Sequence, residues 1–175
     1  MKMELNYSFI IPVYNRPEEI RELLQSMQEL EFPTSFEIVI VEDGSTLSCE
    51  EMVKDFQKKL RISYYFKPNS GPGDSRNFGM EKAKGNYFLI LDSDVLLPPN
   101  YLYEVNSYLL PNYTDCFGGP DAAHPEFSNL HKAINYAMTS FFDNRGNSWQ
   151  AKNQWVNSSH GVLIWVCPKK LLKLP

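Results

Sequence analysis

The chain of 175 residues is 43% hydrophobic and 22% charged, with a net charge of −4, which is the composition of one soluble globular domain that can bury a core. Nothing in this acidic composition indicates a nucleic-acid binder, which normally presents a basic face. No segment approaches the ~20 apolar residues that span a bilayer, and the apolar run at 9–13 is too short for a signal peptide, so we expect a cytoplasmic protein, with peripheral binding at the inner face of the membrane left open.

The N-terminal part of the chain predicts a strand followed by a helix. Residues 7–13 (YSFIIPV) form an apolar run typical of a strand that is buried on both faces of a sheet. Pro17 suits the first position of a helix, and Glu18 and Glu19 complement the positive end of its dipole. Apolar residues then recur at spacings of three and four, which predicts an amphipathic helix to about Leu30.

A second strand, a second helix and a third strand are predicted next. Residues 37–41 (EIVIV) read as a buried strand that ends in the acidic turn 42–45. Ser48 and Glu51 have the spacing of a capping box, which marks the start of a helix. Residues 62–66 predict the third strand.

The next segment opens with a glycine-rich loop at 69–73. It leads into a predicted helix at 74–83, for which Gly85 suits the C-terminal cap. Residues 87–91 form a continuous apolar run and predict another strand buried on both faces. Further expected elements are a helix near 101–109, a strand at 115–117, a helix between 127 and 141 and an apolar run at 161–166.

Strands that alternate with helices predict an α/β fold with a mainly parallel sheet. We see no repeat or linker, so a single domain over 1–175 is expected. In such sheets ligands bind outside the carboxyl ends of the strands. Three polar clusters are expected to meet at that edge, at 14–16, 42–43 and 92–94.

Asp92 and Asp94 follow directly after the strand at 87–91. Side chains at i and i+2 of a strand point to the same side, so the two carboxylates are expected to lie together and repel each other. A bound Mg²⁺ or Mn²⁺ would relieve this repulsion, because both ions prefer oxygen ligands. The alternative is that the aspartates cap the following turn.

The glycine-rich loop and the acidic turn are the other candidate site segments. Gly71 and Gly73 allow the backbone to approach a ligand closely, although a plain surface turn is the alternative. Arg76 could meet a phosphate or orient the acidic turn, and the alternative is a surface ion pair. Asp43 could accept a hydrogen bond from the N–H of a base, since an ionised carboxylate only accepts, or it could cap a helix or turn.

Taken together, four motifs resemble family 2 glycosyltransferases with the GT-A fold. They are FIIPVYNR at 9–16, IVIVEDGS at 38–45, GPGDSRN at 71–77 and GNYFLILDSD at 85–94, in the order and spacing of the family. The resemblance implies a nucleotide-diphosphate sugar as donor, usually a UDP-sugar, and inversion at the anomeric carbon. A Mn²⁺ or Mg²⁺ cofactor and a saccharide or lipid-linked acceptor, as in polysaccharide biosynthesis, fit this interpretation.

Carried over position by position, the resemblance assigns the first two motifs to the nucleotide. It implies that Pro12, Tyr14 and Arg16 line the nucleotide pocket. It also implies that Asp43 pairs with the uracil ring, with Glu42 beside it. Glu42 replaces the commoner Asp of the family, which leaves the acidic turn intact.

The later motifs complete the site implied by the resemblance. Arg76 and Asn77 flank the nucleotide. Asp92 lies near the ribose and the donor sugar, and Asp94 is the expected direct ligand of the metal ion, so these two aspartates form the predicted metal motif.

The resemblance weakens after about Pro120. Gly119 is expected near the donor sugar, and His160 is a candidate contact to the acceptor or a phosphate, with a polar surface histidine as the alternative. The catalytic base of the family comes from an acidic pair after the strand at 161–167, and no such pair occurs before Pro175. The catalytic residue is therefore unassigned, and we expect a truncated chain of a longer enzyme, which the ending in mid-pattern favours, or a degenerate member.

Three functions are weighed for this chain. The leading hypothesis is an inverting glycosyltransferase, and the alternative is a non-catalytic module that binds a nucleotide sugar, because no downstream base is present. A sugar nucleotidyltransferase would carry a glycine-rich loop after the first strand, where residues 12–16 stand instead. A phosphate-loop NTPase is excluded by the lack of a Gly-Lys-Ser/Thr sequence.

Overall fold

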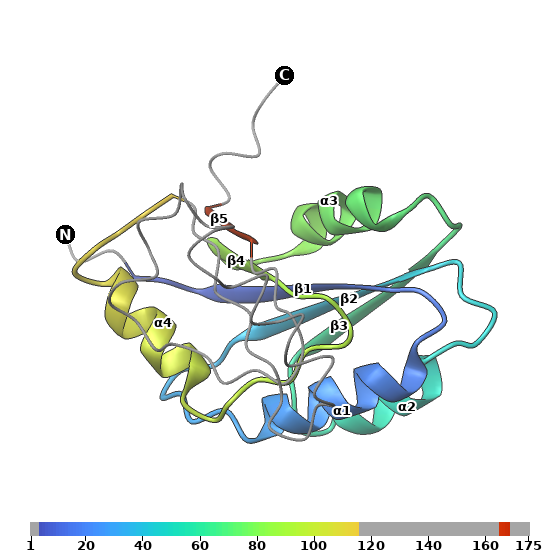
Figure 1. Ribbon diagram of the computed structural model, residues 1–175, viewed down its shortest axis with the longest axis horizontal. Coiled ribbons are helices and arrows are strands. Elements are labelled where there is room, and N and C mark those ends of the chain that lie inside the picture. The colour runs from blue at the N-terminus through green and yellow to red at the C-terminus, as the bar shows by residue number, and fades with distance from the viewer. Residues whose placement is uncertain (1–3, 116–164, 169–175) are drawn as a thin grey trace, which may run out of the picture.

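A five-stranded sheet in the order β3-β2-β1-β4-β5 lies at the centre of the computed structural model, which describes residues 4–115 and 165–168 (Figure 1). Its strands are β1 (Tyr7–Val13), β2 (Glu37–Asp43), β3 (Ile62–Lys67), β4 (Tyr87–Ile90) and β5 (Trp165–Pro168). The first four are parallel, and β5 runs antiparallel beside β4. The carboxyl ends of the four parallel strands therefore share one edge of the sheet, which is the edge where α/β proteins bind ligands.

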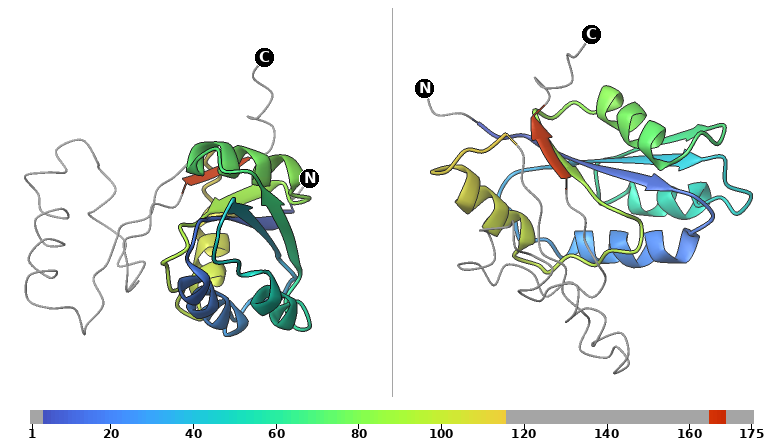
Figure 2. Two further views of the ribbon diagram at one scale, coloured as in Figure 1. Left: turned by 90° about the vertical axis from the view of Figure 1, so that its right-hand side faces the viewer. Right: turned by 45° about the horizontal axis from the view of Figure 1, so that its top comes forward.

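Helices cover both faces of this sheet (Figures 1 and 2). On one face, called the α1 face, lie α1 (Pro17–Gln28), α2 (Glu50–Phe56) and α4 (Tyr101–Leu109), and on the other, the α3 face, lies α3 (Pro72–Lys82). Side chains alternate along each strand, so Phe9 and Ile11 of β1 join the core of the α1 face and Ile10 joins that of the α3 face. Burial on both faces explains why these strands read as continuous apolar runs.

Most elements predicted from periodicity are confirmed within two residues of their bounds. Pro17 is the first residue of α1, and the helix buries the apolar positions that the pattern predicted, Ile20, Leu23, Leu24 and Met27. The predicted elements at 115–117 and 127–141 lie outside the described residues, except for Asp115, which is not in a strand. Of the last apolar run, only residues 165 and 166 are described, and they belong to β5.

The part of the chain that the structure describes contains no helix long and apolar enough to cross a membrane.

The predicted capping box at the start of α2 is wrong. The helix begins at Glu50, whose N–H donates to the hydroxyl of Ser48 at 3.1 Å, and Glu51 turns outward to pair with Lys54 at 2.7 Å. The N–H of Cys49 donates instead to the carboxylate of Glu42, in β2, at 3.2 Å. A partner from β2 thus takes the role that the sequence pattern gave to Glu51.

The prediction that Gly85 caps α3 is also wrong. The helix ends at Lys82, and its C-cap residue Ala83 has an extended backbone rather than the left-handed one of a glycine cap. The N–H of Gly85 donates to the hydroxyl of Ser8 at 3.0 Å, and a Cβ at Gly85 would lie 2.5 Å from the carbonyl oxygen of Asn6. This glycine is required because its backbone lies against β1.

Gly79 allows α3 to lie close to the sheet. A Cβ at Gly79 would be 2.6 Å from Cγ2 of Ile10 and 3.2 Å from Cγ2 of Val41. Both neighbours are fully buried in the core of the α3 face, where close packing leaves little room for an added methyl group. Gly79 therefore sets the spacing between α3 and the sheet, and with it the position of Arg76 one turn earlier in the same helix.

Gly79→Ala is expected to lower the free energy of unfolding by about 1–3 kcal/mol, because overpacking of the core outweighs the better helix propensity of Ala. Gly73 in the same helix is a matched control, since nothing lies within 4 Å of a Cβ built there. Gly73→Ala is expected to be neutral or to stabilise by up to ~1 kcal/mol. Urea unfolding measures both variants, and equal effects at the two positions would contradict this account of the packing.

Candidate functional site

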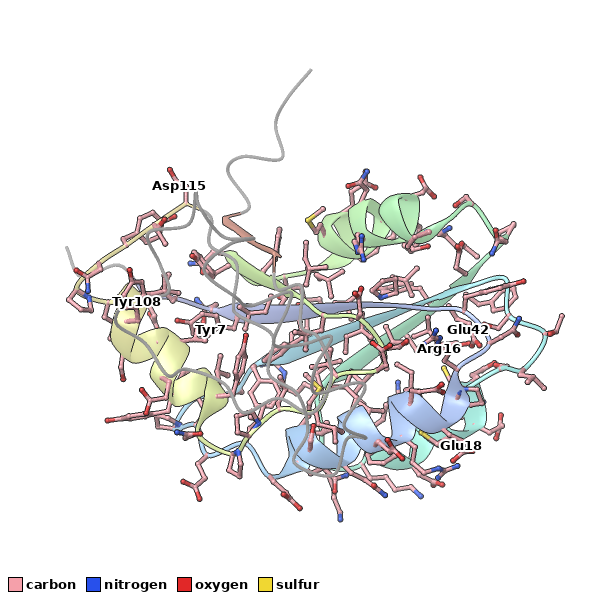
Figure 3. The ribbon with its side chains drawn as sticks, viewed as in Figure 1. Tyr7, Arg16, Glu18, Glu42, Tyr108 and Asp115 are labelled. Atoms are coloured by element: carbon pink, nitrogen blue, oxygen red, sulfur yellow. The ribbon has the colours of Figure 1, made fainter. Side chains whose placement is uncertain are left out.

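The candidate site lies at the carboxyl edge of the parallel strands. Figure 3 places Arg16 and Glu42 at this end of the sheet, whereas Tyr7 and Tyr108 lie at the other end. The three polar clusters predicted from the sequence belong to β2 and to the segments that follow β1 and β4. The parallel pairing of these strands therefore gathers residues that are far apart in the sequence.

Asp43, the last residue of β2, joins the sheet to the glycine-rich loop before α3. Its side chain is only 4% exposed. Its Oδ1 accepts the N–H of Ser70 at 2.9 Å, and its Oδ2 accepts the N–H of Gly71 at 2.8 Å. Gly71 has a φ of +94°, which residues with a side chain rarely adopt. The first glycine of the loop thus turns its backbone toward Asp43.

Lys67, the last residue of β3, lies opposite Asp43 in the register of the two strands. Its ammonium group donates to Oδ1 of Asp43 and to the hydroxyl of Ser70, and it lies 3.3 Å from a carboxylate oxygen of Asp74. No sequence motif gave a role to Lys67, Ser70 or Asp74. A cross-strand pair of opposite charges was the available signal, but it becomes visible only once the register of β2 and β3 is known.

The charges in this network support one another. Burial acts to raise the pKa of Asp43, but the hydrogen bond from Lys67 and those from the two backbone N–H groups outweigh it and hold the pKa below its ordinary value. Burial acts to lower the pKa of Lys67, but its hydrogen bonds to Asp43 and Asp74 raise the pKa above its ordinary value. Asp43 and Lys67 are therefore both charged at neutral pH.

Glu42 faces the opposite side of the sheet from Asp43. It is fully buried, and its carboxylate accepts the N–H of Cys49 at 3.2 Å, the hydroxyl of Ser48 at 3.0 Å and the hydroxyl of Tyr64. Burial and the neighbouring Glu42 raise the pKa of the Cys49 thiol to about 12, so this thiol is protonated at neutral pH. Glu42 therefore holds the start of α2 against β2, on the face that Asp43 does not occupy.

Asn15 ties the loop after β1 to the loop after β2. Its φ of +54° lies in the left-handed region, which asparagine tolerates better than most residues. Its Oδ1 accepts the N–H groups of Thr46 at 2.8 Å and Leu47 at 2.9 Å, and its own N–H donates to the hydroxyl of Ser45 at 2.9 Å. These hydrogen bonds fix the loop after β1, which carries the predicted site residues Tyr14 and Arg16.

Two arginines pair with the aspartates of the predicted metal motif. Nη2 of Arg76, in α3, lies 2.7 Å from Oδ1 of Asp92, and Nη1 of Arg16, at the start of α1, lies 3.0 Å from Oδ2 of Asp94. All four side chains are between 32% and 49% exposed, so both ion pairs are open to solvent. The ion pair of Arg76 with Asp92 agrees with the alternative of a surface ion pair rather than with a contact to the acidic turn at 42–45.

The prediction that Asp92 and Asp94 leave a strand on the same side is wrong, because neither residue follows directly on a strand. β4 ends at Ile90, and a turn begins at Ser93, so the alternation of a strand does not apply to these two residues. Asp92 instead contacts Arg76 within α3, and Asp94 contacts Arg16 at the start of α1. The attraction to arginine, and not a shared strand face, determines where the two carboxylates lie.

Within residues 4–115 and 165–168, no group of three or more His, Cys, Asp or Glu side chains could hold a metal ion on its own. A Mg²⁺ or Mn²⁺ ion that binds together with a nucleotide needs only one or two carboxylates, because phosphates and waters supply its other ligands. Asp92 and Asp94 are partly exposed and can supply such oxygens. The residues present therefore fit an ion of this kind.

The other predicted site residues have fewer contacts. Pro12 is partly buried in β1, and the ring of Tyr14 is 53% exposed in the loop that follows. Asn77 is exposed on α3. Gly119 and His160 lie outside the described residues, so their predicted places near the donor sugar and the acceptor stay predictions.

The same architecture occurs in solved structures of sugar transferases. The structure of Staphylococcus aureus TarS 1–349 in complex with UDP-GlcNAc has a TM-score of 0.61 and 30% identity, over 70% of this chain and 39% of that chain. The mannosyltransferase PcManGT from Pyrobaculum calidifontis, in complex with GDP-Man and Mn²⁺, has a TM-score of 0.60 over 65% of this chain and 35% of that chain. Its 22% identity supports the fold alone. The fold is that of GT-A glycosyltransferases, as predicted.

Sequence comparison identifies the family. Residues 8–166 match the family described as Glycosyl transferase family 2. An uncharacterized glycosyltransferase of Rickettsia bellii is 42% identical over 97 residues, which are 54% of this chain and 14% of that protein. The poly(ribitol-phosphate) beta-N-acetylglucosaminyltransferase TarS of Staphylococcus aureus is 32% identical over 114 residues, which are 63% of this chain and 20% of that protein. The chain belongs to glycosyltransferase family 2, as the four motifs predicted, and spans a fifth or less of these two relatives.

Asp43→Asn is expected to lower the free energy of unfolding at pH 7 by about 3 kcal/mol, because the mostly buried Lys67 loses its buried anionic partner and keeps only the exposed Asp74. The pKa of Asp43 is lowered in the folded state, so its stabilising effect is complete above the unfolded value of about 4 and is lost as the pH falls through the lower folded value. The difference between wild type and variant should therefore narrow in acid.

Urea unfolding at pH 7 and at about pH 3 tests this expectation. Asp55→Asn is a matched control, because Asp55 forms an exposed ion pair with Lys58 on the surface of α2, and it is expected to change stability little at either pH. If Asp43→Asn lowers the free energy of unfolding equally at both pH values, the charge of Asp43 is not the source of the stabilisation.

Proposed function

We propose that this chain carries the donor site of an inverting glycosyltransferase, which transfers a sugar from a UDP-sugar to a saccharide or lipid-linked acceptor. The observation that carries the proposal is the convergence of Asp43, Asp92 and Asp94 with two arginines at the carboxyl edge of a family 2 domain. A site for a nucleoside diphosphate needs a hydrogen-bonding group for the base, cationic groups for the phosphates and oxygen ligands for the metal ion that accompanies them. This edge offers all three.

Asp43 would contact the base by accepting a hydrogen bond from it. Its carboxylate is charged and only accepts hydrogen bonds, which suits the N–H of uracil. Pro12 and the exposed ring of Tyr14 follow β1 at the same edge and would border the base, while Glu42 supports this part of the site from behind. Uridine as the nucleoside is supported by TarS, whose structures contain UDP and UDP-GlcNAc at about 30% identity to this chain.

Asp92, Asp94 and the two arginines would contact the diphosphate and its metal ion. Asp94 would hold a Mn²⁺ or Mg²⁺ ion, with Asp92 near the ribose and the donor sugar. The ion, when bound, neutralises the charge of the departing diphosphate. Arg16 and Arg76 hold the two carboxylates in place and offset their charge, which lowers the repulsion that an anionic donor meets, and Asn77 lies next to Arg76 on the same helix.

The acceptor side of the proposal depends on residues outside the described part of the chain. Gly119 is proposed near the donor sugar and His160 near the acceptor or a phosphate. Inverting transfer also needs a base within hydrogen-bond reach of the acceptor hydroxyl, and that base is unassigned.

One observation favours a non-catalytic module as the second candidate. Four of the carboxylates described at this edge, on Glu42, Asp43, Asp92 and Asp94, already accept hydrogen bonds from protein groups. Glu42 is fully buried, and Asp43, Asp92 and Asp94 are proposed to contact the donor and its metal ion, so none of the four is assigned to take a proton from an acceptor. Donor binding without any transfer to a sugar acceptor would favour this second candidate.

UDP is expected to bind roughly tenfold or more tightly than GDP or ADP, since the carboxylate of Asp43 matches the single N–H of uracil and a hydrogen bond to a charged group contributes about 1.5–3 kcal/mol. Isothermal titration calorimetry in MnCl₂ measures the three affinities. Equal or tighter binding of a purine nucleotide would refute the assignment of uridine.

Asp94→Ala is expected to weaken UDP binding roughly tenfold or more in MnCl₂ and to change it little in chelator, because the variant removes a ligand of the ion. Asp55→Ala removes an exposed, ion-paired carboxylate on α2 and should leave both affinities unchanged. If Asp94→Ala weakens binding equally under the two conditions, the carboxylate acts only through its ion pair with Arg16.

A further inference from the structure

We propose that Lys67 makes the site selective against guanine nucleotides, because it occupies an acceptor position on Oδ1 of Asp43 that guanine would need. This inference rests on the proposed function, in which Asp43 contacts the base. It adds a specificity-determining residue that the sequence motifs did not single out.

The carboxylate of Asp43 has two oxygens and about four acceptor positions in all. Oδ1 accepts the ammonium group of Lys67 and the N–H of Ser70 at 2.9 Å. Oδ2 accepts the N–H of Gly71 at 2.8 Å. Oδ1 is therefore saturated, and the position that remains for a ligand is on Oδ2.

Lys67 is held firmly in this arrangement. Its side chain is only 10% exposed, and the ammonium group also contacts the hydroxyl of Ser70 and lies 3.3 Å from a carboxylate oxygen of Asp74. Asp74 is in the first turn of α3 and accepts the hydroxyl of Ser70 as well. A ligand cannot displace Lys67 from Asp43 without breaking this ion pair and disturbing the contacts of Lys67 to Ser70 and Asp74.

The pairing edges of the two bases differ in the number of adjacent N–H donors. Guanine presents two neighbouring donors, the ring N–H and the exocyclic amino group, and a carboxylate receives them best with one oxygen each. Uracil presents a single ring N–H between two carbonyl oxygens, and one acceptor position is enough for it. With Oδ1 of Asp43 filled by Lys67 and Ser70, the carboxylate suits uracil and leaves one guanine donor without a partner, which is costly in a buried contact.

The test measures the affinities of UDP and GDP for the wild-type chain, Lys67→Met and Lys67→Arg by calorimetry in MnCl₂. Lys67→Met frees an acceptor position on Oδ1, so the preference for UDP over GDP is expected to fall about tenfold. Lys67→Arg retains the donors and is expected to keep the preference within about twofold. Lys58→Met, which removes an exposed lysine of the segment after α2, should change neither affinity.

A parallel loss of both affinities in Lys67→Met, with the preference unchanged, would overturn the proposal and leave Lys67 with a structural role. If Lys67→Met does not fold, Asp74→Asn takes its place, since it loosens Lys67 from outside the buried pair. It should lower the preference in the same direction, and an unchanged preference would again overturn the proposal. Failure of the wild type to bind either nucleotide would refute the proposed function itself, and this inference with it.

Discussion

Strand alternation determines the direction of the two consecutive carboxylates at the end of β2, and the site depends on this constraint. Glu42 points to the α1 face and holds the start of α2, whereas Asp43 points to the α3 face and holds the glycine-rich loop before α3. Helices on both faces are thus fixed from a single dipeptide. A shift of β2 by one residue would exchange the two roles and place each carboxylate against the wrong layer.

The frame of the fold could be predicted because burial imposes a period on the sequence. The apolar run of β1 and the spacings of three and four in α1 reflect the layers that cover them. Local chemistry was less reliable. Glu51 was expected to cap α2, but Glu42 supplies the contact from the neighbouring strand, and Gly85 is a glycine because it lies against Asn6 and Ser8. Both contacts join residues that are separated in the sequence, so no local pattern contains them.

In the candidate site, too, the residues in local motifs could be predicted, whereas their contacts with residues distant in sequence could not. Local sequence motifs singled out Asp43, Asp92 and Asp94 as candidates. The parallel topology gathers these three residues at one edge of the sheet. Their partners could not be predicted, because the pairing of Asp43 with Lys67 requires the register of β2 and β3. The positions of Asp92 and Asp94 were misjudged for a related reason, since a strand was assumed to continue through residues that form a turn.

The ion pairs at this edge have a consequence for the kinetics of binding. Apart from the fully buried Glu42, cations and carboxylates are nearly balanced there, with Arg16, Lys67 and Arg76 against Asp43, Asp74, Asp92 and Asp94. Opposite charges in contact cancel at a distance, so an anion that approaches from beyond the Debye length, about 8 Å at physiological ionic strength, meets little net attraction. Electrostatic steering therefore contributes little to the association rate, which should depend only weakly on salt, and the ion pairs begin to matter once the anion is close enough to exchange partners with them.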